Sequence, residues 1–165
     1  MMRLLLATML FCFTTLTQAA DTRFDSIYFF QSQAELEKKG INIESFGRYT
    51  RVLQTQIYRA LKKVKMPQSA GYLVVAVRSD GEVATWLDMS PAVHEHYDNQ
   101  IYETVKKINP VDVRSGILVF GIKMAIDTAV HTQKAVPEPP DWPEARKKLN
   151  DPGNIEELVL SLWPE

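Results

Sequence analysis

The residues with the clearest metal-ligand character are His94, Glu95 and His96. Imidazole and carboxylate groups bind zinc, and His131 or Asp98 could supply a further ligand if folding brought it close. Two histidines two positions apart at the start of a helix point to different sides, so they would chelate only on an extended backbone. We therefore predict surface histidines and no metal or cofactor. A metal-binding or hydrolytic protein centred on His94 and His96 stays open as an alternative.

Groups suited to nucleophilic or acid–base catalysis are sparse. The chain has no Gly-x-Ser-x-Gly motif, and Ser79 and Ser90 occupy turn positions, where a serine hydroxyl usually bonds the local backbone. Asp80, Glu82 and Asp88 could be imagined as paired carboxylates, but the first two belong to a hairpin turn. Because no grouping meets the geometry of an active site, the sequence predicts a protein that is not an enzyme.

Residues 1–20 have the composition of a secretory signal peptide: a positive start at Arg3, an apolar run from Leu4 to Phe13, and small residues at Ala19 and Ala20. The run is only about ten residues long, whereas crossing a bilayer takes about 20. We expect cleavage, a periplasmic location and no stable membrane insertion afterwards; an uncleaved N-terminus that tethers the chain is the alternative. Cys12 is the only cysteine, so cleavage would leave no disulfide or thiolate chemistry.

The formal net charge of −1 gives the chain no overall attraction to nucleic acid, which we exclude as a partner. One local group of cations is present. It consists of Arg59, Lys62, Lys63 and Lys65. Cations at this place are typical of a solvated helix end, where they favour the C-terminal dipole.

The central part of the chain carries the strongest periodic patterns. Between Ile43 and Val64 apolar residues recur at three- and four-residue steps, which predicts a long helix. Gly71–Arg78 and Val83–Met89 predict two strands joined by a hairpin turn at Asp80-Gly81. A second helix is expected at about Val93–Lys107, and a third strand at Gly116–Ile126.

The two ends of the chain are less regular. Ile27–Gln31 is either a strand or a packing arm, and Val136–Pro143 is proline-rich and must be extended or irregular. The last segment, Ile155–Leu162, predicts a short helix that docks on this chain or on a partner. We therefore divide the chain into a signal peptide (1–20), an N-terminal extension (21–42), a domain (43–128) and a Pro-rich linker with a helical tail (129–165).

The succession from Phe46 to Ile126 resembles the C-terminal domain of TonB and TolA. The matching parts are RYTRVLQTQIYRALKKVKMP, GYLVVAVRSDGEVATWLDM, YDNQIYETVKKINP and GILVFGIKMAI. The first helix is more similar to that of TolA. The transmembrane anchor and the long spacer of the energy-coupling family members are not visible, which argues against a transducer acting alone.

The resemblance implies a passive interaction module of the cell envelope. Together with the order of elements, it predicts an α+β fold with a three-stranded antiparallel sheet in the order 2-1-3 and helices on one face. The third strand is then an edge, open to strand addition by an envelope protein or to a homodimer. The residues expected to bind there are Ile117, Val119, Gly121, Ile122 and Met124. Two aromatic residues, Tyr72 and Trp86, are expected either in the core or at an interface.

Overall fold

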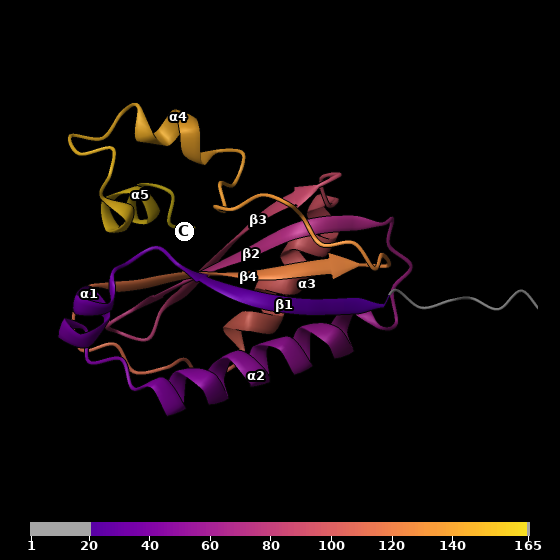
Figure 1. The fold of residues 1–165 in the computed structure, drawn as a ribbon, viewed down its shortest axis with the longest axis horizontal. Helices are drawn as coiled ribbons and strands as arrows, with labels where there is room; N and C mark the ends of the chain where they lie inside the picture. The colour runs from indigo at the N-terminus through magenta and orange to yellow at the C-terminus, as the bar shows by residue number, and fades with distance from the viewer. Residues whose placement is uncertain (1–20, 165) are drawn as a thin grey trace, which may run out of the picture.

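The computed structural model describes residues 21–164. In chain order the elements are β1 (Thr22–Phe29), α1 (Gln33–Lys38), α2 (Ile43–Leu61), β2 (Ser69–Arg78), β3 (Val83–Ser90), α3 (Glu95–Lys106), β4 (Ile117–Ile126), α4 (Trp142–Arg146) and α5 (Ile155–Ser161). The strands form one antiparallel sheet in the order β1-β4-β2-β3. The fold is therefore α+β, with α2 and α3 on one side of the sheet and α4 and α5 on the other (Figure 1).

The expected three-stranded sheet of order 2-1-3 with helices on one face is wrong. β1 adds a fourth strand beside β4. Its register shifts between Phe24 and Ile27, where Asp25 and Ser26 form a bulge. Because the bulge interrupts the alternation of apolar and polar residues, the sequence pattern of this segment is too short to predict a strand.

Gln31 prolongs the pairing of β1 with β4 through its side chain. The amide Nε2 donates to the carbonyl of Ile117 at 2.7 Å, and Oε1 accepts from the N–H of Val119 at 3.0 Å. The buried side chain thus takes the place of a peptide unit in the ladder. Residues 21–42, expected as an extension of the domain, are therefore part of the sheet unit.

The hairpin of β2 and β3 is confirmed. Eight consecutive pairs join the two strands without a register shift, and Gly81 in the turn has φ +88°. A positive φ is readily accessible only to glycine. Gly71 of β2 lies so close to β3 that an added Cβ would be 1.9 Å from the carbonyl oxygen of Asp88.

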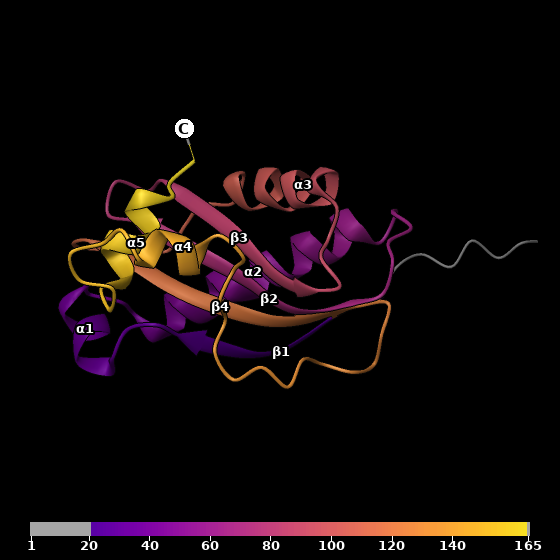
Figure 2. The same ribbon diagram turned by 90° about the horizontal axis from the view of Figure 1, so that it is seen from above.

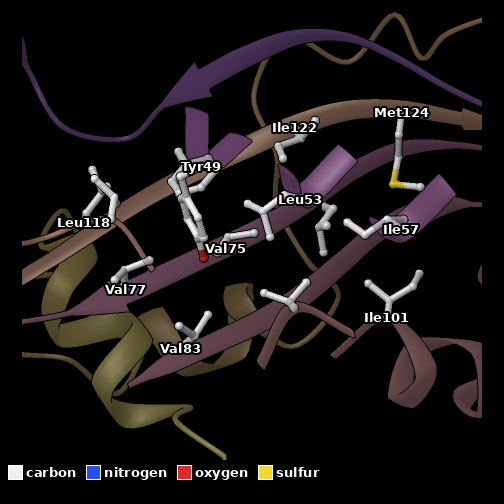
Figure 3. Packing of buried hydrophobic residues seen from close by; sticks show 14 of the residues in the cluster. Tyr49, Leu53, Ile57, Val75, Val77, Val83, Ile101, Leu118, Ile122 and Met124 are labelled. Carbon is white, nitrogen blue, oxygen red and sulfur yellow. The ribbon is translucent and has the colours of Figure 1, made fainter. Parts of the chain in front are cut away.

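The main core lies between the sheet and the helices α2 and α3. α2 begins at the N-cap Asn42, whose side chain accepts from the N–H of Ser45 at 2.9 Å. Figure 3 shows its side chains above the strands, with Leu53 and Ile57 facing residues of β2 and β4. The predicted amphipathic stripe of this helix is therefore confirmed as its buried face.

The C-terminal segment covers the second face of the sheet, as seen in front of the strands in Figure 2. Trp142 of α4 and Leu158 and Val159 of α5 form a second core with Val74 and Val119. Helices therefore cover both faces, and the tail docks on this chain.

The tail is held at its far end by a carboxylate. Glu156 pairs with the buried Lys39 and accepts from the N–H of Ile117 at 3.0 Å. Between β4 and α4, the hydroxyl of Tyr72 donates to the carbonyl of Lys134 at 2.8 Å. These polar contacts tie the segment to three different parts of the fold. No helix within residues 21–164 has the length and apolar character needed to cross a membrane.

Candidate functional site

The predicted binding strand is not an edge. β4 pairs with β1 on one side and with β2 on the other, so its backbone groups are used within the sheet. The residues expected to bind a partner there, Ile117, Val119, Gly121, Ile122 and Met124, are all buried. Their side chains pack in the two cores or under Pro137. Strand addition at β4 is therefore excluded by β1, which occupies the position that a partner would take.

The outer edge of β3 is the open flank of the sheet. The N–H of Arg78 donates to the carbonyl of Glu82 at 2.9 Å, which fixes the alternation of the β2–β3 ladder. In an antiparallel ladder, residues whose backbone groups bond to the neighbouring strand alternate with residues whose backbone groups do not. The backbone N–H and C=O groups of Ala84 and Trp86 therefore point toward β2. Thr85 and Leu87 direct their N–H and C=O groups away from the sheet. No backbone bond from these two residues to another element occurs within residues 21–164.

The opposite edge, formed by β1, has features that discourage pairing. It carries the bulge at Asp25 and Ser26, and its exposed side chains include the charged Arg23 and Asp25. Bulges and charges are the usual means by which natural edge strands avoid contact with another chain. β3 has no bulge along its pairing with β2. Its single charged side chain, Asp88, is engaged by Lys134 and Glu138 of the C-terminal segment.

A groove of about 190 Å³ runs beside β3. The strand side of the groove includes Thr85 and Leu87, and the side toward α3 includes Val93, which precedes that helix, and Asp98 within it. The other wall is formed by residues 139–141 of the C-terminal segment. The open backbone of β3 is thus flanked on both sides, as a site for one extended segment requires.

Two polar groups in this groove distinguish it from a simple apolar hollow. The hydroxyl of Thr85 is buried and has no hydrogen-bond partner. The pKa of Asp98 is raised, mainly by burial and further by the nearby carboxylate of Glu95. Both effects indicate a partly desolvated wall with unused hydrogen-bonding capacity. A cationic side chain in a bound segment would offset the carboxylate.

Asp88 holds the wall of the groove in place. Its carboxylate accepts from Lys134 Nζ at 2.7 and 2.8 Å and from the N–H of Glu138 at 2.7 Å. These bonds fasten the proline-rich segment directly before Pro139. Asp88, which was considered for a carboxylate pair and set aside, has a structural role, since its oxygens are engaged with Lys134 and Glu138.

The other residues considered for chemistry have local roles. His94 is the N-cap of α3, and its Nδ1 accepts from the N–H of His96 at 3.1 Å. Asp80 pairs with Arg78 and accepts from the N–H of Glu82 within the hairpin turn. Within residues 21–164, no three His, Cys, Asp or Glu side chains are grouped so that they could hold a metal ion.

The other residues considered for catalysis or metal binding, Ser79, Ser90 and His131, lie in separate parts of the fold. Ser79 donates its backbone N–H to the carbonyl of Gly116 at 3.0 Å, and Ser90 ends β3. His131 follows β4, and its Nδ1 is buried without a partner. Within residues 21–164, no side-chain hydrogen bond joins Ser79 or Ser90 to a histidine.

The aromatic residues expected in the core or at an interface lie beneath the tail. Tyr72 is buried, with 3% of its surface exposed. Trp86 is half-buried and packs edge-on against Trp142, with ring centroids 5.8 Å apart. A second ring, Trp163, lies 6.3 Å from it. Trp86 therefore packs against the second core, and Tyr72 is buried beneath the segment that follows β4.

The basic group is spread around the end of α2. Lys62, Lys63 and Lys65 are exposed after the last turn, and Lys62 Nζ lies 5.8 Å from the centroid of the Tyr58 ring. Arg59 points to a different surface, a groove between α2 and α3. This arrangement agrees with cations at a solvated helix end.

Sequence reasoning did not single out the residues that form the β3 groove. The hairpin pattern predicts β3 itself, and an order of 2-1-3 already leaves that strand at one edge. The wall at residues 139–141 has a weaker signal, because a proline-rich stretch is equally typical of an unpacked linker. Trp142, directly after it, is the residue whose burial brings the wall to the sheet.

Comparison of the chain with models of known families, with curated proteins and with solved structures finds no match.

Proposed function

We propose that this chain is a protein-binding module of the bacterial cell envelope that captures an extended segment of a partner along the outer edge of β3. The observation that carries the proposal is the bulge-free outer edge of β3. There the backbone groups of Thr85 and Leu87 point into a groove between α3 and residues 139–141. In such a site the backbone bonds supply affinity, and alternate side chains supply selection.

Two features of the sequence support an envelope partner. Residues 46–126 resemble the C-terminal domain of TonB and TolA, an interaction module. Residues 1–20 read as a secretory signal and lie outside the described residues. On this reading the chain acts in the periplasm, as an accessory or adaptor of envelope transport or integrity machinery.

The charges around the groove favour a bound segment with a cationic side chain. Asp98 lies in one wall, with Glu95 nearby, and Asp141 lies in the other. Three carboxylates around one short edge favour a lysine or arginine in the partner strand. The rings of Pro139 and Pro140 offer apolar surface to the residues on either side of that lysine or arginine in the bound segment.

Site-specific photo-crosslinking in living cells tests the proposal. A photoreactive phenylalanine analogue is placed at Thr85, on the open edge, and at Ser26, on the bulged edge, in two separate variants. We expect a discrete adduct with another envelope protein from position 85 and none from position 26. Equal adducts from both positions, or none from position 85, would refute the site. An adduct containing two copies of this chain would show that the segment bound at β3 comes from a second copy rather than from another protein.

A pair of substitutions separates the backbone from the side chain. Leu87→Pro removes the outward N–H without breaking the ladder to β2, since proline is tolerated where the N–H faces away from the sheet. Leu87→Ala loses the side chain but keeps the N–H. The adduct should persist in Leu87→Ala and disappear in Leu87→Pro, with both variants folded by circular dichroism.

A further inference from the structure

A larger hollow lies on the helical side of the molecule, between α2 and the C-terminal end of α3. Its volume is about 880 Å³, within the range of about 300–1,000 Å³ found for small-molecule sites. It shares no lining residue with the groove beside β3. Its occupant is therefore independent of the partner proposed above.

An unpartnered hydroxyl lies in the wall of this hollow. Tyr49 lines it with 4% of its surface exposed, and its phenol oxygen is buried without a hydrogen-bond partner. In Figure 3 the ring lies over β2, and its hydroxyl end points toward Val83 rather than toward Ile122 of β4. Buried hydroxyl groups are nearly always hydrogen-bonded. The Tyr49 hydroxyl is therefore a donor that the protein leaves unused.

Burial further favours the protonated form of this phenol, which is already the form of an ordinary tyrosine at neutral pH. It raises the pKa of Tyr49 far above its ordinary value, since a phenolate would be desolvated. The group is therefore a hydrogen-bond donor under all physiological conditions. A donor of this kind matches an anionic oxygen better than a neutral one.

The charges around the hollow favour an anion as well. Arg48, Arg59 and Lys107 line it and are exposed. None of the three forms an ion pair within residues 21–164. The one acidic side chain of the lining is Asp112.

Apolar surface accompanies these cations. Val52 of α2 has 44% of its surface exposed and lines the hollow. Ile108, Pro110 and Val111 face it from the segment after α3. The hollow therefore combines an apolar wall, a buried donor and a cationic rim.

We propose that this hollow binds a small anionic amphiphile, a carboxylate carried on an alkyl or aromatic body. The carboxylate accepts from the Tyr49 hydroxyl and lies among Arg48, Arg59 and Lys107. The apolar body lies against Val52 and the segment after α3.

Titration with decanoate tests the proposal, using the protein purified without truncation and the cation decyltrimethylammonium as the probe of opposite charge. Calorimetry should show saturable one-to-one binding of decanoate and binding at least about tenfold weaker for the cation. In NMR spectra, decanoate should shift the amides of 48–60 and 104–112 but not those of β3. Non-saturable binding, or equal binding of the two probes, would overturn the proposal.

Three variants locate the contacts. Tyr49→Phe keeps the ring in the core and should weaken decanoate binding about tenfold, as expected for a hydrogen bond to a charged group. Arg59→Gln should weaken it about two- to fivefold, the effect of one exposed charge. Arg51→Gln is the matched control, since Arg51 is exposed on the same helix outside the hollow. Unchanged affinity in Tyr49→Phe and Arg59→Gln, or an equal loss in Arg51→Gln, would assign the binding to another surface.

Discussion

Replacing Trp142 by alanine tests whether the C-terminal segment is an integral layer of the fold. The side chain is fully buried. Its ring centroid lies 5.3 Å from that of Phe30 and 5.8 Å from that of Trp86. It is the largest fully buried side chain of the second core, and it directly follows the wall of the β3 groove at residues 139–141. Trp142→Ala removes the anchor of that wall.

The expected cost follows from two opposing contributions. Truncation of a buried tryptophan to alanine lowers the free energy of unfolding by about 3–5 kcal/mol. The indole Nε1 of Trp142, however, is buried without a partner, and an unsatisfied donor costs about 1–3 kcal/mol in the wild-type protein. Trp142→Ala removes the unsatisfied N–H, so this contribution partly offsets the loss of free energy of unfolding. We therefore expect a loss at the lower end, about 3 kcal/mol.

Urea unfolding followed by far-ultraviolet circular dichroism measures this loss without relying on tryptophan fluorescence. The midpoint should fall, and the free energy in water follows by linear extrapolation. Trp142→Phe is the matched control: it keeps an aromatic ring in place and removes the orphaned N–H, so it should cost less than about 1.5 kcal/mol. A Trp142→Ala protein within about 0.5 kcal/mol of the wild type would refute the view that this residue anchors the tail.

Three further substitutions have defined outcomes. Glu156→Gln removes the charge that pairs with the buried Lys39 and should lower the free energy of unfolding by about 2 kcal/mol, measured by urea denaturation. Gly71→Ala places a Cβ 1.9 Å from the carbonyl oxygen of Asp88, so the two strands must separate, and we expect a loss of at least about 3 kcal/mol in the same assay. The raised pKa of Asp98 means that the folded protein binds its proton more tightly than the unfolded chain does. The free energy of unfolding of the wild type relative to Asp98→Asn should therefore fall as pH rises from the ordinary aspartate range through the raised pKa, as measured by thermal melts across that range.

The first two of these predictions each have a matched control. Glu157→Gln changes the neighbouring carboxylate, which makes no ion pair within residues 21–164, and should cost little. Gly47→Ala adds a Cβ with nothing within 4 Å in the middle of α2, where alanine is the better helix former, and should stabilise by about 0.5–1 kcal/mol. Equal losses in either matched pair, or a stability difference for Asp98→Asn that does not change with pH, would contradict the contacts assigned here.

Local patterns were sufficient for the centre of the chain. The apolar stripe of α2, the Asp80-Gly81 turn and the apolar run of β4 each depend on residues close in sequence, and all three are confirmed. The physical reason is that helix periodicity and turn chemistry are decided within a few residues.

The number of strands could not be obtained in this way. β1 is interrupted by its bulge, and its pairing partners lie far away along the chain, as Ile122 does for Ile27. An edge is a property of the whole sheet. Because Ile27–Gln31 stayed open between a strand and a packing arm, β4 was expected at an edge that β1 in fact covers.

The candidate site depended on the same long-range information. Thr85 is an unremarkable strand residue in sequence, and it becomes part of a site only because α3 and the segment before Trp142 flank β3. The hollow at Tyr49 is a similar case, since the stripe pattern of α2 predicts a buried tyrosine but not an unpartnered hydroxyl.

The central claim is that the outer edge of β3 is open in the free protein. Native-state amide hydrogen exchange measures this residue by residue. The amides of Thr85 and Leu87 should exchange orders of magnitude faster than those of Ala84 and Trp86, which bond to β2. Uniformly slow exchange along all four residues would show that this edge is already covered, and the proposed capture of a partner strand would fail.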